Sequence, residues 1–165
     1  MNRCIVCSSQ SGSLIEQYIY SSVCSRCHEN YGICQTSCGC CSICSRALTL
    51  DLIHRIATAR RAAQTWNQVV VLKGAHTVVA FPDGGAVLSP FANPGLATAG
   101  TGDVLAGVIA GLVSQGLSLA DAAALGVFLH GSAGERVRSE LGDTGMVASD
   151  LLPALPRAIN ALRAG

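Results

Sequence analysis

The chain has 165 residues, which is the size of one ordinary domain or of a small domain with an appendage. Half of its residues are hydrophobic and 13% are charged, which excludes an intrinsically disordered chain. The formal net charge of +1 disfavours nucleic acid as a partner, because proteins that follow phosphate backbones usually carry a basic excess. There is no run of about 18 apolar residues and no apolar signal sequence after Met1, so we expect a cytoplasmic protein without a membrane span.

The first part of the chain differs from the rest in composition. All nine cysteines lie between Cys4 and Cys44, whereas the sequence from Arg46 onward is rich in Ala, Leu, Gly and Val. We therefore predict two parts, a Cys-rich segment of residues 1–45 and an aliphatic domain of residues 46–165. A segment of about 45 residues is below the size that usually folds without a metal or disulfides.

The cysteine spacing in this segment fits a structural zinc site. Two C-x-x-C pairs are separated by 16 residues, and each pair can hold a tetrahedral ion from one tight turn. The candidate zinc ligands are Cys4, Cys7, Cys24 and Cys27. Two alternatives stay open: a disulfide framework, which a reducing compartment disfavours, and a Cys-rich leader with no role of its own.

The aliphatic domain opens with a predicted helix and three short strands. Thr49 can cap a helix that runs to about Trp66, with its apolar residues along one side. The continuous apolar run Val69–Leu72 is typical of a buried strand. Residues 77–81 and 86–88 are predicted to form a hairpin around a Pro-Asp-Gly-Gly turn.

After a predicted loop over residues 89–98, the sequence predicts three helices. Residues 103–114 are apolar on all sides, which is typical of a buried helix, and their small residues predict close packing against a neighbour. Ser118 can cap the next helix, which runs to about Leu141. Ser149 can cap a last helix, which we expect to be interrupted by its two prolines.

The main chemical signal is the tetrapeptide Gly100-Thr101-Gly102-Asp103, where the first of these helices begins. A Gly-x-Gly segment that enters a helix presents backbone N–H groups at the positive end of the helix dipole, which suits an anion such as phosphate. Asp103 would repel that anion, but it can act as a base toward a hydroxyl that attacks phosphorus. The alternative role for Asp103 is a helix cap.

The surroundings of this tetrapeptide resemble a known enzyme family. Residues 93–107 are similar to the signature of the ADP/ATP-dependent NAD(P)H-hydrate dehydratases, which belong to the ribokinase-like superfamily and form the C-terminal domain of YjeF-type repair proteins. Residues 71–77 resemble the family's nucleotide-binding strand and loop. Residues 129–135 and 148–152 resemble its closing helices. The resemblance covers about residues 46–165 and implies an α/β fold, the C-terminal half of a ribokinase-like three-layer sandwich, behind the Cys-rich segment.

This resemblance implies the repair of hydrated NADH and NADPH (NADHX and NADPHX). ATP or ADP would phosphorylate the hydrate hydroxyl, phosphate would leave, and magnesium is expected to assist. Asp103 would be the catalytic base and would touch the substrate. The implied nucleotide-binding residues are Lys73, Gly74, Ala75, His76, Thr77, Asn93, Pro94, Gly95, Leu96, Ala97, Thr98, Ala99, Gly100, Thr101 and Gly102.

Three of the basic residues have simpler interpretations. Lys73 can be a solvated charge at a strand end, and His76 is expected to contribute backbone rather than imidazole. His130 lies on a mostly apolar helix, where we expect a hydrogen-bonded packing histidine rather than a catalytic one.

The match departs from the family in length, because a complete domain of this type is roughly twice as long. The chain can be a truncated or fused reading frame, a half that needs a complementing chain, or a domain reused without catalysis. We expect it to self-associate through exposed strand and helix surfaces, and to turn over hydrated NADH slowly. The alternative function is a zinc-binding regulatory or interaction module that carries a catalytically inactive half-domain.

Overall fold

The computed structural model describes residues 50–142 and 144–164, and these form two compact units. The hairpin unit contains residues 50–72 and 78–90, and the helical unit contains residues 73–77 and 91–164. Each unit is described by itself. The predicted Cys-rich segment, its four candidate zinc ligands and the predicted cap Thr49 lie outside the described residues.

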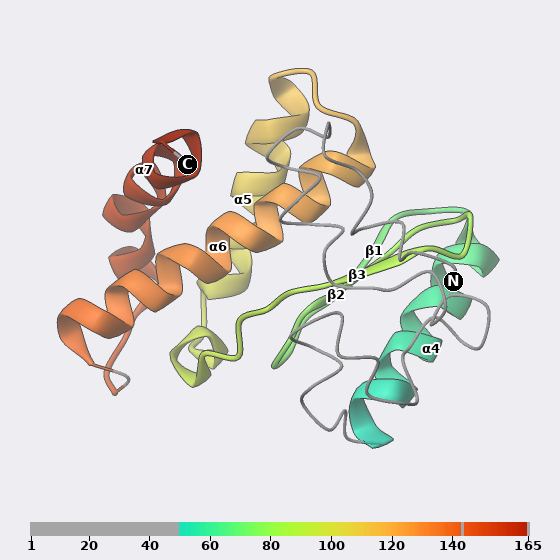
Figure 1. Cartoon of the computed structure of the whole chain (residues 1–165), viewed down its shortest axis with the longest axis horizontal. Coiled ribbons are helices and arrows are strands. Elements are labelled where there is room, and N and C mark those ends of the chain that lie inside the picture. Colours follow the sequence, from blue (N-terminus) through green and yellow to red (C-terminus); the bar gives the residue numbers. More distant parts are fainter. Residues whose placement is uncertain (1–49, 143, 165) are drawn as a thin grey trace, which may run out of the picture. The chain divides into compact units, whose positions relative to one another are not determined.

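The hairpin unit packs helix α4 (Leu50–Trp66) on a small sheet, as Figure 1 shows. The predicted apolar side of the helix is confirmed, because it supplies four of the seven buried core residues. That core consists of the buried residues Leu52, Ile56, Ala59, Ala63, Val78, Ala80 and Leu88. On the polar side, the guanidinium of Arg55 donates to the carbonyl of Leu72 at 3.3 Å. The helix and the sheet therefore share one hydrophobic layer and at least one polar contact.

The sheet has three antiparallel strands in the order β1 (Val70–Leu72), β2 (Val78–Ala80), β3 (Ala86–Leu88). The predicted hairpin of β2 and β3 is confirmed. The prediction of a buried first strand is wrong, because all three residues of β1 are half-buried. β1 is an edge strand of this sheet, whereas β2 pairs on both sides and is buried throughout. An apolar run of this length does not reveal whether a strand is central or at an edge.

The helical unit contains α5 (Thr101–Ser114), α6 (Leu119–Leu141) and α7 (Ala148–Ala164), with α5 and α7 both packed against α6 (Figure 1). The predicted cap of α6 is confirmed, since the hydroxyl of Ser118 accepts a hydrogen bond from the amide of Asp121. Twelve residues of α6 are buried, so this helix is the central element of the unit.

The burial of α5 that its apolar pattern predicts is wrong for this structure, whereas the exposed helix surface expected of a partial domain is present. Only Thr101 and Leu105 of this helix are buried, and a Cβ built at Gly107 or Gly111 would meet nothing within 4 Å. The close approach of α5 and α6 instead uses Gly126, whose Cβ would come 2.6 Å from the side chain of Ile109. An all-apolar helix has no polar face that would show which side meets its neighbour.

Among the described residues, no helix has both the length and the apolar character needed to cross a bilayer.

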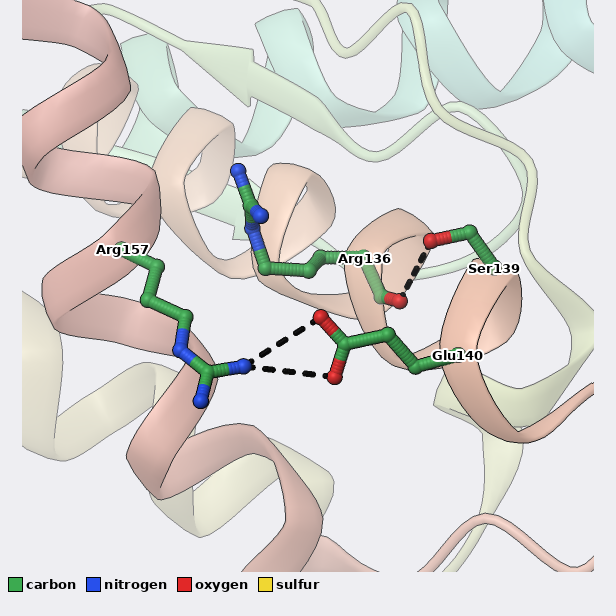
Figure 2. A network of polar contacts seen from close by, with 4 residues as sticks. All are labelled: Arg136, Ser139, Glu140 and Arg157. Carbon is green, nitrogen blue, oxygen red and sulfur yellow. Dashed lines mark hydrogen bonds and ion pairs between the residues drawn. The ribbon is translucent and has the colours of Figure 1, made fainter.

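The prediction for the last helix is also corrected, because α7 continues through Pro153 and Pro156. Its first carboxylate, Asp150, accepts a hydrogen bond from the amide of Val147. Between α7 and α6, Arg157 donates to both carboxylate oxygens of Glu140, at 3.2 and 3.3 Å (Figure 2). Both side chains are about half exposed, so this ion pair adds no more than about 1 kcal/mol. The α6–α7 contact therefore depends mainly on apolar packing.

Candidate functional site

The turn that begins α5 has the geometry expected of an anion site. Gly100 caps the helix in the left-handed region at φ +85°, a conformation that favours glycine. The Thr101 amide donates to the Thr98 carbonyl at 3.3 Å, and the amides of Asp103 and Val104 donate to the Gly100 carbonyl. Within the described part of the chain, the amide of Gly102 has no such acceptor. One N–H group at the positive end of the helix is therefore available to a ligand.

Thr101 fastens this turn from inside. Its side chain is almost fully buried, and its hydroxyl lies 2.7 Å from the Leu96 carbonyl and 2.8 Å from the Thr98 carbonyl. Because both its amide and its hydroxyl bond within the loop, Thr101 shapes the site. We do not expect its side chain to touch a ligand.

The lysine predicted to bind nucleotide reaches this turn. The ammonium of Lys73 donates to the hydroxyl of Thr101 at 3.4 Å, and a Cβ built at Gly102 would lie 3.5 Å from the same nitrogen. A positive charge beside the positive end of a helix is unfavourable by itself and becomes favourable when an anion lies between them. The side chain is thus directed at the anion turn, which disfavours the interpretation of Lys73 as a charge solvated away from the site.

The rest of the segment Lys73–Thr77 is fixed by its own hydrogen bonds. The amide of His76 donates to the Phe91 carbonyl at 3.1 Å, and the hydroxyl of Thr77 donates to the Gly74 carbonyl. His76 has φ +53°, which is uncommon for a residue with a side chain. These contacts connect the segment to the start of the loop at residues 91–100, so the two predicted nucleotide-binding segments lie together.

The loop before α5 contains a short 3-10 helix, η1 (Pro94–Ala97), where the sequence predicted irregular loop. Asn93 caps it, because its Oδ1 accepts from the Gly95 amide at 2.9 Å. Among the described atoms, Nδ2 of the same buried side chain has no hydrogen-bond partner. A buried donor without an acceptor costs about 1–3 kcal/mol.

Two of the predicted binding residues in this loop face the protein interior. Leu96 packs on α6, where a Cβ at Gly134 would clash with it at 2.8 Å, and buried Gly95 lies against Met146. The side chain of Leu96 is therefore occupied by packing, while Ala97, Thr98 and Ala99 are exposed. Asp103 is also exposed, in the first turn of α5, where a carboxylate can reach a bound substrate or simply interact with the helix dipole.

His130 of α6 holds the anion turn from the protein side. Its Nε2 lies 2.8 Å from the carbonyl oxygen of Thr101, and only 4% of the residue is exposed. A carbonyl accepts and does not donate, so Nε2 carries the hydrogen. Burial lowers the pKa of His130 below its usual value. The charge of Lys73 lowers this pKa further, and the hydrogen bond to Thr101 raises it. The prediction of a hydrogen-bonded packing histidine is confirmed, but the sequence did not reveal its acceptor.

The lowered pKa of His130 predicts a stability change at mildly acidic pH. Above pH ~6.5 the imidazole is neutral in both the folded and the unfolded chain, so it adds no pH dependence. Below that pH the unfolded chain takes up a proton more readily, and the free energy of unfolding falls by up to about 1.4 kcal/mol per pH unit until the folded pKa is passed. Urea unfolding between pH 5 and 8 measures this slope. His130→Gln should flatten it, and an equal slope in that variant would contradict the assignment.

Two glycines beside His130 let the loop approach α6. A Cβ at Gly131 would clash with Cδ2 of Phe91 and lie 2.8 Å from its Cγ, and a Cβ at Gly134 would lie 2.8 Å from Cδ2 of Leu96. The ring of Phe91 also packs against Phe128 of α6, with ring centroids 5.4 Å apart. The sequence contained a signal for this close approach of the loop to α6. Two glycines inside a helix cost about 1 kcal/mol each, so their presence indicates that another segment packs closely there.

Gly131→Ala is expected to destabilise the protein by about 1–2 kcal/mol. The gain in helix propensity of about 1 kcal/mol is outweighed by the displacement of the whole Phe91 ring, since overpacking typically costs about 1–3 kcal/mol. Denaturant unfolding measures the change. Gly107→Ala on the open face of α5 is the matched control and should be neutral or stabilising. A stabilised Gly131→Ala variant would show that Phe91 moves aside freely.

Comparison with known proteins identifies the family. The family model described as NAD(P)H-hydrate dehydratase matches residues 42–157, more than half of the chain. The chain is similar to the bifunctional NAD(P)H-hydrate repair enzyme Nnr of Moorella thermoacetica, with 50% identity over 108 residues that cover 66% of this chain and 20% of that protein. It is also similar to the ADP-dependent (S)-NAD(P)H-hydrate dehydratase of Xanthomonas campestris, with 39% identity over 62% of this chain and 36% of that protein.

The solved structures agree. The ADP/ATP-dependent NAD(P)H-hydrate dehydratase of Bacillus subtilis, co-crystallised with ATP/Mg²⁺ and soaked with CoA, matches with a TM-score of 0.63 and 37% identity. The match covers 66% of this chain and 40% of that chain, so the present chain spans well under half of the relatives it matches. The predicted fold is confirmed at the level of this shared ribokinase-like part. With more than half of its length matched by the family model, the chain belongs to the NAD(P)H-hydrate dehydratase family.

Proposed function

We propose that the helical unit binds the phosphates of ADP or ATP at the turn of residues 100–103. The observation that carries this proposal is the Gly102 amide, which has no acceptor in the described chain and lies next to the Lys73 ammonium. Both groups are hydrogen-bond donors: the ammonium carries a full positive charge and the amide N–H a partial one. They lie together where a helix begins. The related enzyme of Bacillus subtilis was co-crystallised with ATP/Mg²⁺, which supports the choice of ligand.

The substrate we propose is hydrated NADH or NADPH, as the names of the relatives suggest. Asp103 accepts the proton of the hydrate hydroxyl while the hydroxyl oxygen forms its bond to the terminal phosphorus of the nucleotide. The bond from this phosphorus to the bridging oxygen breaks, and ADP leaves from ATP or AMP from ADP. The new phosphate group then leaves with its oxygen, the neighbouring ring carbon loses a proton to solvent, and the C=C bond of the dihydronicotinamide ring is restored. The turn stabilises charge on the transferred group through the Gly102 amide and Lys73.

Magnesium is proposed as the metal that accompanies the nucleotide. Residues 50–142 and 144–164 contain no group of three or more His, Cys, Asp or Glu that could hold a metal ion. Mg²⁺ commonly binds through substrate phosphates and waters, with few protein carboxylates. The described residues therefore fit an ion that arrives with the nucleotide, and no protein cage is required.

We also propose that the boundary between the two predicted parts lies near residue 45. The family match begins at residue 42, close to the change in composition, which supports this placement. The matched relatives are much longer than this chain. We therefore propose only those steps of their activity for which this chain itself contains the residues.

Calorimetric titration of the full chain with ADP and with ATP, each with magnesium, tests the proposed site. We expect saturable binding of one nucleotide per chain, and competition by the other nucleotide. Dihydronicotinamide absorbance after addition of hydrated NADH tests the proposed reaction in the same samples. A chain that binds neither nucleotide would refute the proposed site, whereas binding without turnover would refute only the assigned reaction for this chain.

A further inference from the structure

We infer that His130 is a positioning residue that sets the direction of the Gly102 amide. The carbonyl that His130 holds belongs to Thr101, and the N–H of Gly102 belongs to the same peptide unit. A peptide unit is planar and trans, so its C=O and N–H point in opposite directions. A hydrogen bond that fixes the carbonyl on the protein side therefore fixes the N–H on the ligand side. This inference rests on the proposed function, in which that amide meets a phosphate.

The surroundings of His130 suit this role. The imidazole is buried and lies on α6, the central helix of the unit, so it is a rigid point of reference. The hydroxyl of Thr101 bonds to loop carbonyls at 2.7 and 2.8 Å. Its peptide is thus held at both the side chain and the carbonyl. A donor on the carbonyl also polarises the peptide, which strengthens its N–H as a donor to an anion.

The chemical requirement at position 130 is an N–H donor at the place of Nε2. Glutamine can place its side-chain N–H near that position, whereas leucine has a comparable volume and no donor. The two variants therefore separate the hydrogen bond from the packing. His54, which is exposed on α4, provides a control substitution outside the helical unit.

The experiment combines nucleotide binding with NMR of the full chain. We expect His130→Leu to weaken ADP binding about tenfold, the size of one lost buried hydrogen bond, while His130→Gln stays within about threefold of the unmodified chain. Without nucleotide, the Gly102 amide signal should shift in His130→Leu and keep its position in His130→Gln. His54→Leu should change neither quantity. If His130→Leu fails to fold, two tests of the inference remain: the comparison of His130→Gln with the unmodified chain, and the tautomer of His130.

Several outcomes would overturn the inference. Equal ADP affinity in His130→Leu and the unmodified chain would do so, as would equal weakening by glutamine and leucine. Long-range ¹H–¹⁵N spectra that show the Nδ1–H tautomer of His130 would also refute it, since no hydrogen would then face Thr101. Failure of the unmodified chain to bind ADP, with the Gly102 signal and the tautomer as expected, would refute the proposed function and leave the positioning of the peptide supported.

Discussion

Gly102→Val is expected to abolish ADP binding while the protein stays folded. A Cβ at this position already lies 3.5 Å from the Lys73 nitrogen, so the two further methyl groups of valine would occupy the space where the amide and the ammonium meet an anion. Overpacking costs about 1–3 kcal/mol and a lost bond to a charged group about 1.5–3 kcal/mol, which together weaken binding at least about 100-fold. Calorimetry with ADP measures the loss.

The control for this variant lies on the same helix. Gly107→Val introduces the same side chain where a Cβ would meet nothing within 4 Å, so ADP affinity should not change. Circular dichroism and a melting curve should show that both variants keep the helices. ADP affinity in Gly102→Val within about tenfold of the unmodified chain would mean that the phosphates bind elsewhere.

Asp103→Asn is expected to separate chemistry from binding. Removal of a general base lowers turnover of hydrated NADH by about 10²–10⁴-fold. ADP affinity should remain or rise slightly, because a negative charge near the bound phosphates is lost. Turnover is followed by dihydronicotinamide absorbance and affinity by calorimetry.

Asp121→Asn is the matched control, since Asp121 also lies in the first turn of a helix and is exposed. It should lose a little stability through its contact with Ser118 and leave both turnover and ADP affinity unchanged. Complete loss of ADP affinity in Asp103→Asn would instead assign Asp103 to the structure of the turn, as a cap or through the helix dipole.

Local sequence patterns predicted most elements of the described chain. The start of α6 at Ser118 and the hairpin around Pro82–Gly85 follow from side-chain capping and turn chemistry, which act over a few residues. The exposed strand edge expected of a partial domain agrees with the place of β1 at the end of the sheet, whereas the half-burial of its side chains did not follow from the apolar run. An exposed helix surface was expected of a partial domain, but which face of α5 is exposed did not follow, because its apolar residues surround the helix.

The continuity of α7 shows how packing overrides a local signal. Both prolines are exposed, whereas Leu151, Ala154 and Ala158 form the buried stripe of the same helix. Carbonyls that lose their helical partner on the exposed side can bond to water, so the break expected from Pro153 and Pro156 does not occur. The sequence showed the prolines but not their orientation.

The candidate site was predictable in its segments and not in its contacts. Gly-x-Gly before an apolar helix indicates an anion turn by itself, and the segment of Lys73 was recognised by family resemblance. The contact of Thr101 with His130 joins residues 29 positions apart, and it depends on the packing of α6 against the loop. A single sequence carries no direct signal for such a pair, although the neighbouring glycines indicated that something approaches α6.

The segment Lys73–Thr77 is the whole connection between β1 and β2, which pair from Leu72 and Val78. The chain therefore leaves the hairpin unit for five residues and returns to it. Lys73 belongs to the helical unit, but in the sequence it lies between two strands of the hairpin unit. A fragment that starts at residue 91 would contain the turn, α5, α6 and α7 but no Lys73. An insertion in this connection would leave the strand pairing intact and still displace the ammonium. Protein engineers who shorten, permute or split this chain should therefore keep residues 70–80 on the same polypeptide as α5, at their present length.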